Sequence, residues 1–287
     1  MQSETTAGRA ETGAILSIIV YLILAAGKLA AGHWAGSQGL TADGLNNTTD
    51  ILASLAVLIG LRISKIPADA DHRYGHFRAE TVASLVASFI MAAVGIQVLI
   101  GAAGKLMHPV HTAPDLWAAA VAGISGLAMY GVYRYNLRLA RETGSHALKA
   151  AAADNRSDAW VSFGTVIGIA GSAWGLAWLD ALTALIVGLL ICRTAWEVFR
   201  EASHMLTDGF DVEELEKYKR TVSSMEGVDR VKDIRGRVYG NQIIVDLTIE
   251  VDQEMTVLTS HALSDSIEEK LRDKYNIRQT HVHIEPF

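Results

Sequence analysis

Two short polar motifs interrupt apolar stretches of the sequence and carry the side chains best suited to chemistry. The segment ADGLNNTTD places Asn46 and Asp50 four residues apart, and the segment ADNRSD places Asp154 and Asp158 at the same spacing. Residues at this spacing lie on one face of a helix, so two helices could bring four oxygen-bearing side chains to one point. Carboxylate and amide oxygens are preferred ligands of hard divalent cations. The two motifs therefore indicate a candidate metal site.

An alternative interpretation is that neighbouring cations neutralise these acids. Arg156 is two residues from both Asp154 and Asp158, so it lies on another face of the same helix. Lys28 is a single cation for several acids, which include Asp43 in the first motif. Carboxylates that cluster without a cation repel one another strongly in a low dielectric, so they bind protons or a metal ion. The cation-binding interpretation is therefore favoured.

The charges divide the chain into an apolar body and a charged tail. Residues 1–200 carry 27 charged side chains and residues 201–287 carry 29, of which 18 are acidic. An acidic tail argues against a nucleic acid partner. The single cysteine, Cys192, excludes a disulfide framework or a thiolate metal cluster within one chain. Metal chemistry in this chain must therefore use oxygen and nitrogen ligands.

The body contains apolar stretches of the length needed to cross a membrane. About 20 mainly apolar residues span the hydrocarbon layer. Six stretches qualify, namely 13–36, 40–63, 78–104, 114–135, 150–174 and 177–199. Lys and Arg concentrate in segments 62–78 and 134–149, and such segments remain in the cytoplasm. We therefore predict a multi-pass protein of the cytoplasmic (plasma) membrane, embedded in its lipid bilayer, with both termini in the cytoplasm.

The sequence predicts three parts along the chain. They are a cytoplasmic N-terminal tail over residues 1–12, a six-span transmembrane domain over 13–207 and a cytoplasmic C-terminal domain over 208–287. The fold class is thus an α-helical membrane protein followed by a small soluble domain.

The C-terminal domain alternates between helical and strand periodicity. Residues 211–222 repeat with a helical period, whereas 228–239 and 242–252 alternate with a period of two around a turn at Gly240 and Asn241. Thr256 is a candidate N-cap for a second helix. That helix ends near Asn276, before a short strand over 280–284. The order α-β-β-α-β predicts a small α+β, ferredoxin-like domain with an open sheet and helices on one face.

The paired motifs, the segment PADADHRYGHFRAE after the second apolar stretch, and the α-β-β-α-β tail together resemble the cation diffusion facilitator family over residues 13–287. The resemblance implies a secondary transporter that exports divalent metals in exchange for protons and works as a homodimer. Carried over by position, it places the transport site at Asn46, Asp50, Asp154 and Asp158.

The resemblance also bears on the choice of metal. Zinc exporters of this family have histidine at the position of Asp154, whereas manganese exporters resemble the Asn-Asp-Asp-Asp set found here. Zinc favours nitrogen and sulfur ligands, and harder ions favour oxygen. We therefore expect Mn²⁺ as the transported ion, with Fe²⁺, Zn²⁺ or Cd²⁺ as alternatives and no prosthetic group.

A second candidate metal site lies in the segment after the second apolar stretch. Asp69, His72 and His76 match positions that bind a further metal ion in some family members. Two histidines four residues apart with a nearby carboxylate form a reasonable ligand set. An exposed loop with histidines and no metal is an equally open interpretation.

A third candidate site lies in the C-terminal domain, where the family has a regulatory metal cluster. Lys232 and Thr248 stand where zinc-binding relatives have histidine, and a cationic Lys232 would repel a metal ion. We therefore expect at most a reduced site. Its candidate ligands are His261, His283 and Glu285, with His281 or Asp246 in support.

Two other classes of function compete with transport. An intramembrane aspartyl protease also uses paired acids, but the chain lacks the GxGD motif of those enzymes, and it lacks a GxxxxGK[ST] loop for a nucleotide. An enzyme is therefore not expected. A membrane-anchored metal sensor remains an alternative, and it predicts that Asp50 and Asp158 are dispensable for metal movement.

Replacing Asp154 by histidine tests whether ligand type sets the choice of metal. Asp154→His supplies an imidazole nitrogen suited to Zn²⁺ and removes one oxygen and one negative charge that Mn²⁺ needs. We expect the ratio of Zn²⁺ to Mn²⁺ transport to rise, mostly through loss of Mn²⁺ flux, and Asn46→Asp to change it less. Competitive flux of both metals into the same vesicles measures this ratio. An unchanged ratio in Asp154→His would mean that geometry sets selectivity.

Overall fold

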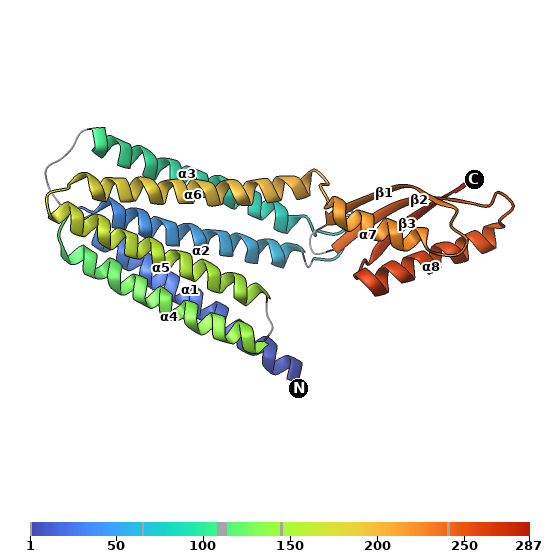
Figure 1. Ribbon diagram of the computed structural model, residues 1–287, viewed down its shortest axis with the longest axis horizontal. Helices are drawn as coiled ribbons and strands as arrows, with labels where there is room; N and C mark the ends of the chain where they lie inside the picture. Colours follow the sequence, from blue (N-terminus) through green and yellow to red (C-terminus); the bar gives the residue numbers. More distant parts are fainter. Residues whose placement is uncertain (1, 65, 108–113, 144–145, 240–241) are drawn as a thin grey trace. The chain divides into compact units, whose positions relative to one another are not determined.

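The computed structural model describes residues 2–64, 66–107, 114–143, 146–239 and 242–287 (Figure 1). Six long helices come first: α1 Gln2–Trp34, α2 Gln38–Ser64, α3 Ala79–Met107, α4 Trp117–Thr143, α5 His146–Ala173 and α6 Trp178–Leu206. The remaining elements are α7 Val212–Ser223, β1 Arg230–Tyr239, β2 Gln242–Val251, α8 Val257–Tyr275 and β3 Gln279–Pro286. The predicted fold class, six helices followed by a small α-β-β-α-β domain, is confirmed.

The chain forms two compact units. One comprises Met1–Leu55 and Ala87–Glu197, and the other comprises Ala56–Val86 and Val198–Phe287. Helix α1 begins at Gln2, so residues 2–12 of the segment expected as a tail form the first turns of this helix.

The apolar character of the six helices is uneven. In the described part of the chain, four segments are long and apolar enough to cross a membrane: Ser17–Trp34, Gln38–Ser64, Ala79–Met107 and Trp178–Leu206. Helices α4 and α5 have comparable lengths of 27 and 28 residues. They are more polar because α4 ends in a basic segment and α5 carries the ADNRSD motif. A helix that lines a polar site within a membrane must be less apolar than its neighbours.

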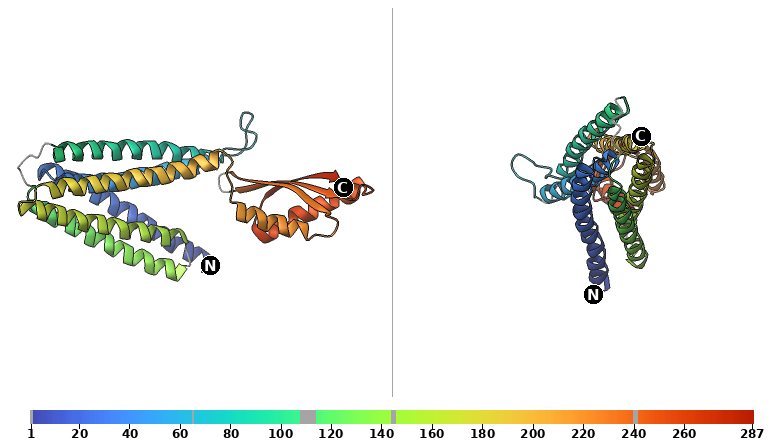
Figure 2. Two further views of the ribbon diagram at one scale, coloured as in Figure 1. Left: turned by 45° about the horizontal axis from the view of Figure 1, so that its top comes forward. Right: turned by 90° about the vertical axis from the view of Figure 1, so that its left-hand side faces the viewer.

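Two apolar clusters hold the helices of the first unit together. Helix α4 packs along α5 and α1, as the views in Figures 1 and 2 agree. One cluster joins α1, α2, α4 and α5 and consists of Ala31, Ala35, Leu40, Ala118, Ala122 and Ile169. The other joins α2, α3 and α6 and consists of Ala42, Val98, Ala102, Ala184, Val187 and Ile191. Most of these side chains are small, as expected where helices pack closely in a membrane.

Two glycines allow α1 and α2 to approach closely. A Cβ atom on Gly44 would lie 3.0 Å from the backbone nitrogen of Leu29, and one on Gly32 would lie 2.7 Å from the backbone nitrogen of Thr41. Any larger residue at either position would push the two backbones apart. This close approach brings polar side chains of α1 within reach of α2.

The N-terminus of α2 is capped by a residue far away in the sequence. The carboxylate of Asp180, in the first turn of α6, accepts hydrogen bonds from the backbone nitrogens of Gln38 at 2.7 Å and Gly39 at 3.2 Å and from Ser37 Oγ at 2.6 Å. Asp180 is buried. It satisfies backbone N–H groups that a helix start leaves unpaired and places negative charge at the positive end of the helix dipole.

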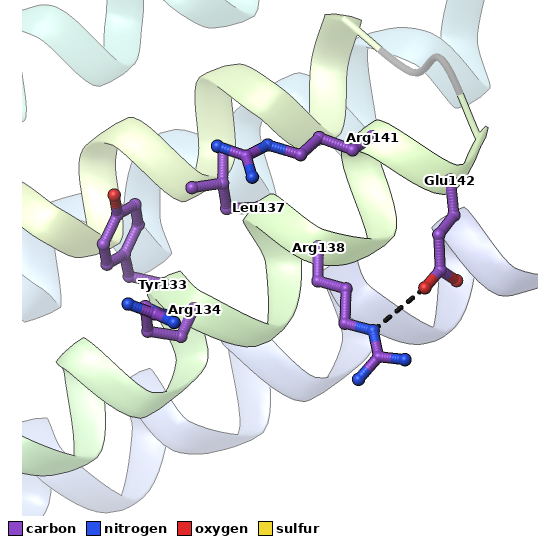
Figure 3. Close-up of a pocket in the computed structure, with 6 residues that line it drawn as sticks. All are labelled: Tyr133, Arg134, Leu137, Arg138, Arg141 and Glu142. Carbon is purple, nitrogen blue, oxygen red and sulfur yellow. Dashed lines mark hydrogen bonds and ion pairs between the residues drawn. The ribbon is translucent and has the colours of Figure 1, made fainter.

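The C-terminal part of α4 is strongly basic. A cavity of about 450 Å³ is lined by Tyr133, Arg134, Leu137, Arg138, Arg141 and Glu142 (Figure 3). Arg138 Nε lies 2.9 Å from Glu142 Oε1. These arginines belong to the segment whose basic residues led us to predict a cytoplasmic location. The lining contains a single carboxylate, so it is not the predicted metal site.

The soluble domain is built around its central strand. β2 pairs with β1 in antiparallel and with β3 in parallel orientation. Its core contains Val245, Leu247, Ile249 and Val251 of β2, Val222 of α7, and Ile267 and Leu271 of α8. Thr256 caps α8 by accepting from the Thr259 nitrogen at 3.2 Å, and Asn276 ends it in the left-handed region, as predicted. The predicted turn at Gly240 and Asn241 lies outside the described residues.

The cap on α2 can be tested by removing its acceptor. Asp180→Ala leaves buried backbone N–H groups of α2 unpaired, which should lower the free energy of unfolding by about 2 kcal/mol. Asp180→Asn keeps one oxygen acceptor and should lose less. The measurement is the thermal unfolding midpoint of the purified protein in detergent, with the exposed Glu197→Gln on the same helix as control. Equal midpoints for Asp180→Ala and the control would contradict the cap.

Candidate metal centre

Asp158 of α5 lies where three helices meet. Its Oδ1 accepts a hydrogen bond from Asn46 Nδ2 of α2 at 3.0 Å, and its Oδ2 accepts one from the Tyr21 hydroxyl of α1 at 2.5 Å. Asp158 is 6% exposed, so both oxygens are engaged by protein donors away from bulk solvent. The structure thus joins one residue from each of the two predicted motifs.

Asp50 and Asp154 complete the predicted set in different ways. Asp50 lies one turn after Asn46 on the same face of α2, and its Oδ2 is buried with no hydrogen-bond partner among the described residues. Asp154 lies one turn before Asp158 and is exposed. A buried carboxylate oxygen without a partner is costly, so a cation or proton at Asp50 would stabilise it.

The three acids do not yet surround a single point. Among described side chains, the carboxylate oxygens of Asp50, Asp154 and Asp158 do not form a group within 4.8 Å of one another. A shared ion would therefore require side-chain rotation or movement of α5 relative to α2. Assignment of the transport site to these residues and Asn46 stays a prediction.

Lys28 of α1 neutralises a different acid. Its Nζ lies 2.9 Å from Asp43 Oδ1, 2.6 Å from Asn47 Oδ1 and 2.9 Å from Ser162 Oγ. Lys28 and Asp43 are both fully buried. A lysine has three N–H donors, and these three contacts use them all. Lys28 therefore has no donor left for Asp50.

Arg156 does not neutralise the motif acids either. It is exposed on α5, and its guanidinium lies 6.0 Å from the ring centre of Tyr133 on α4. A cation over an aromatic face is attracted by the ring. Neither basic residue considered from the sequence therefore pairs with Asp154 or Asp158 in this structure.

Tyr21 is the residue at this site that the motif analysis missed. Tyr21 and Lys28 are seven residues apart in α1, so they lie on one face two turns apart. Ser17, one turn before Tyr21, accepts a hydrogen bond from Asn136 of α4 at 2.8 Å. A polar stripe at helical spacing in an otherwise apolar helix was the available signal.

The loop between α2 and α3 brings its three predicted ligands together. Ligand atoms of Asp69, His72 and His76 lie within 4.8 Å of one another. Asp69 Oδ1 is 3.2 Å from His72 Nδ1, and Asp69 Oδ2 is 3.6 Å from His76 Nε2. A hydrogen bond from the backbone nitrogen of His72 holds the pKa of Asp69 below its usual range. Asp69 is therefore a carboxylate at neutral pH, as a metal ligand must be.

The C-terminal domain brings together only part of its predicted set. His283 Nε2 lies 3.7 Å from Glu285 Oε1, but Lys232 Nζ lies 2.5 Å from Glu285 Oε2. Hydrogen bonding to Glu285 raises the pKa of Lys232, which stays charged. His261 lies 3.9 Å from Asp265 on α8. A site of His261, His283 and Glu285 stays a prediction.

Two family models match this chain, one over its long helices and one over its C-terminal domain. Residues 14–207 match the family described as cation efflux transmembrane domain, and residues 210–287 match the cytoplasmic domain of cation efflux proteins. The chain belongs to the cation efflux family. Cation efflux proteins, also called cation diffusion facilitators, are transporters of divalent metals and not enzymes. The expected family and the absence of an enzymatic function are confirmed.

Relatives in the cation efflux family extend over nearly the whole chain. The manganese efflux system protein MneS of Bacillus subtilis (strain 168) is 52% identical over 97% of this chain and 96% of its own length. The transporter YdbO of the same organism is 51% identical over the same shares. The manganese efflux system protein MneP, also from that strain, is 29% identical over 96% of this chain and 95% of its own.

A double-mutant comparison tests whether Lys28 and Asp43 stabilise the fold as a buried ion pair. Lys28→Met leaves Asp43 buried and unpaired, which should lower the free energy of unfolding by about 3 kcal/mol or more. Adding Asp43→Asn removes the unpaired charge and should recover much of that loss. Thermal unfolding midpoints of the single and double variants in detergent measure this. A double variant that is less stable than Lys28→Met would contradict the pairing.

Proposed function

We propose that this cation efflux protein exports Mn²⁺ from the cytoplasm in exchange for protons, through a site formed by Asn46, Asp50, Asp154 and Asp158. The observation that carries the proposal is the buried, unpartnered Asp50 Oδ2, one helical turn from an Asn46 side chain that is bonded to Asp158. MneS and MneP, which are named as manganese efflux system proteins, support the choice of metal.

The ligand chemistry favours a hard ion. The four side chains offer oxygen atoms only, which suits Mn²⁺ with water or backbone oxygens completing its coordination. Fe²⁺ has overlapping preferences and is the second candidate. Zn²⁺ and Cd²⁺ come next, because no histidine or cysteine stands among the four residues.

The exchange follows from competition for the same oxygens. A metal ion binds deprotonated carboxylates, so its arrival releases protons and its departure lets protons return. Because the three acids do not surround one point in this structure, the bound arrangement requires rotation of their side chains or movement of α5 relative to α2. Alternate opening of the two membrane faces would then carry the ion across without a separate proton relay.

The remaining assignments belong to the same proposal. The protein lies in the cytoplasmic membrane with both termini in the cytoplasm, because its basic segments follow α2 and end α4. It works as a homodimer, as its family does. The loop triad of Asp69, His72 and His76 binds a further metal ion, supported by ligand atoms within 4.8 Å of one another.

Replacing Asp50 tests the site with little risk to the fold, since the buried Oδ2 of this side chain bonds to none of the described residues. Asp50→Ala removes one of three anionic ligands and should nearly abolish Mn²⁺ uptake into vesicles that hold a metal-sensitive dye. Asp115→Asn, at an exposed position just before α4, is the matched control and should transport normally. Wild-type uptake by Asp50→Ala would overturn the assignment of the transport site to this residue.

The same vesicles test the exchange. An acidic interior should accelerate Mn²⁺ uptake, because protons leaving the vesicle drive the metal inward, and an ionophore that collapses the gradient should slow it. Uptake that ignores the gradient would indicate a channel or a uniporter.

A further inference from the structure

We infer that Tyr21 is a positioning residue of the transport site, whose hydroxyl competes with the metal ion for Asp158 Oδ2. The inference rests on the proposed function and assigns a role to a helix, α1, that contributes none of the four proposed ligands. It starts from the contact between the Tyr21 hydroxyl and Asp158 Oδ2 at 2.5 Å.

Both oxygens of Asp158 are engaged, but by donors of different kinds. Asn46 donates through its amide nitrogen to Oδ1, and rotation of the amide would present its own oxygen to a metal ion. The Tyr21 hydroxyl points its hydrogen at Oδ2, and a cation at that oxygen repels this hydrogen. Asn46 can therefore change from donor to ligand, whereas Tyr21 must withdraw.

The two polar contacts of α1 differ in the same way. Lys28 carries a permanent charge and bonds to Asp43 Oδ1, Asn47 Oδ1 and Ser162 Oγ, so the charge of Asp43 is neutralised within the protein. Two turns away, Tyr21 donates a hydrogen bond to Asp158 from a neutral hydroxyl, so the negative charge of Asp158 is not compensated by this contact. Ser162 is one turn after Asp158 on α5, so both contacts of α1 reach the same face of α5.

The consequence for transport is a lowered affinity that promotes release. A hydrogen bond to a charged group is stronger than one between neutral groups, so metal binding at Oδ2 must replace a favourable contact. When the ion leaves, the hydroxyl returns to Oδ2. Tyr21 thus raises the KM for the metal and speeds release to the far side.

Tyr21→Phe removes only the hydroxyl and separates this role from a structural one. We expect the KM for Mn²⁺ to fall by about tenfold, the size expected for one hydrogen bond to a charged group, and kcat to fall with it because release slows. Equilibrium Mn²⁺ binding to the purified protein should tighten by a similar factor. The exposed Tyr135→Phe on α4 loses the same hydroxyl away from the site and should keep the wild-type KM and kcat.

Other outcomes overturn the inference in distinguishable ways. A raised KM in Tyr21→Phe would make Tyr21 a metal ligand, and unchanged constants would give it no role. Tyr21→Leu, which also lacks the hydroxyl, must shift KM and binding in the same direction if Tyr21→Phe does not fold. Asp158→Ala is measured alongside: wild-type transport by Asp158→Ala would overturn the site itself, whereas its loss with an unchanged Tyr21→Phe would overturn the Tyr21 role alone.

Discussion

The energetic cost of burying charge within an apolar helix bundle governs the arrangement of this transmembrane domain. Asp43 and Asp50 lie on one helix two turns apart, yet only Asp43 has a built-in cation, the fully buried Lys28. Breaking such a pair by removing one partner costs several kcal/mol, so Lys28 and Asp43 hold α1 and α2 in register. The buried Oδ2 of Asp50 has no hydrogen-bond partner among the described residues. Because Lys28 already neutralises Asp43, a transported cation is expected at Asp50 instead.

Helix α1 contributes to two levels of the bundle: a Lys28 layer, where Lys28 pairs with Asp43, and a Tyr21 layer, where Tyr21 contacts Asp158. Its close approach to α2 depends on Gly32 and Gly44, and this approach lets Lys28 reach α2 while Tyr21 reaches α5. Any movement that separates α5 from α2 must keep the Lys28 contacts, because an unpaired buried lysine is costly, but it can exchange the neutral Tyr21 contact at smaller cost. The Lys28 layer is therefore suited to be a pivot, and the Tyr21 layer is suited to open and close.

Sequence periodicity predicted the elements but not which faces meet. The six helices, the order of the soluble domain and the Thr256 cap follow from local patterns, and spacing alone placed the paired acids on common faces. Spacing does not set how each helix rotates about its axis in the bundle. Tertiary packing alone therefore determines that Lys28 pairs with Asp43 and that Tyr21 contacts Asp158. It also determines that Asp180 caps α2 from 142 residues away. The contact between Lys232 on β1 and Glu285 on β3 likewise depends on how the strands assemble.

A transport site differs from a storage site in how firmly it holds its ion. Ligands that are fully preorganised around a metal bind tightly and release slowly. Here Asp158 is already engaged by protein donors, because Asn46 and Tyr21 both donate hydrogen bonds to it, whereas Asp154 is exposed. Each internal contact must be exchanged when the metal binds and can form again when it leaves, so the net free energy of binding is the difference between two similar sets of contacts. A small difference of this kind allows protons, which bind the same carboxylates, to displace the ion.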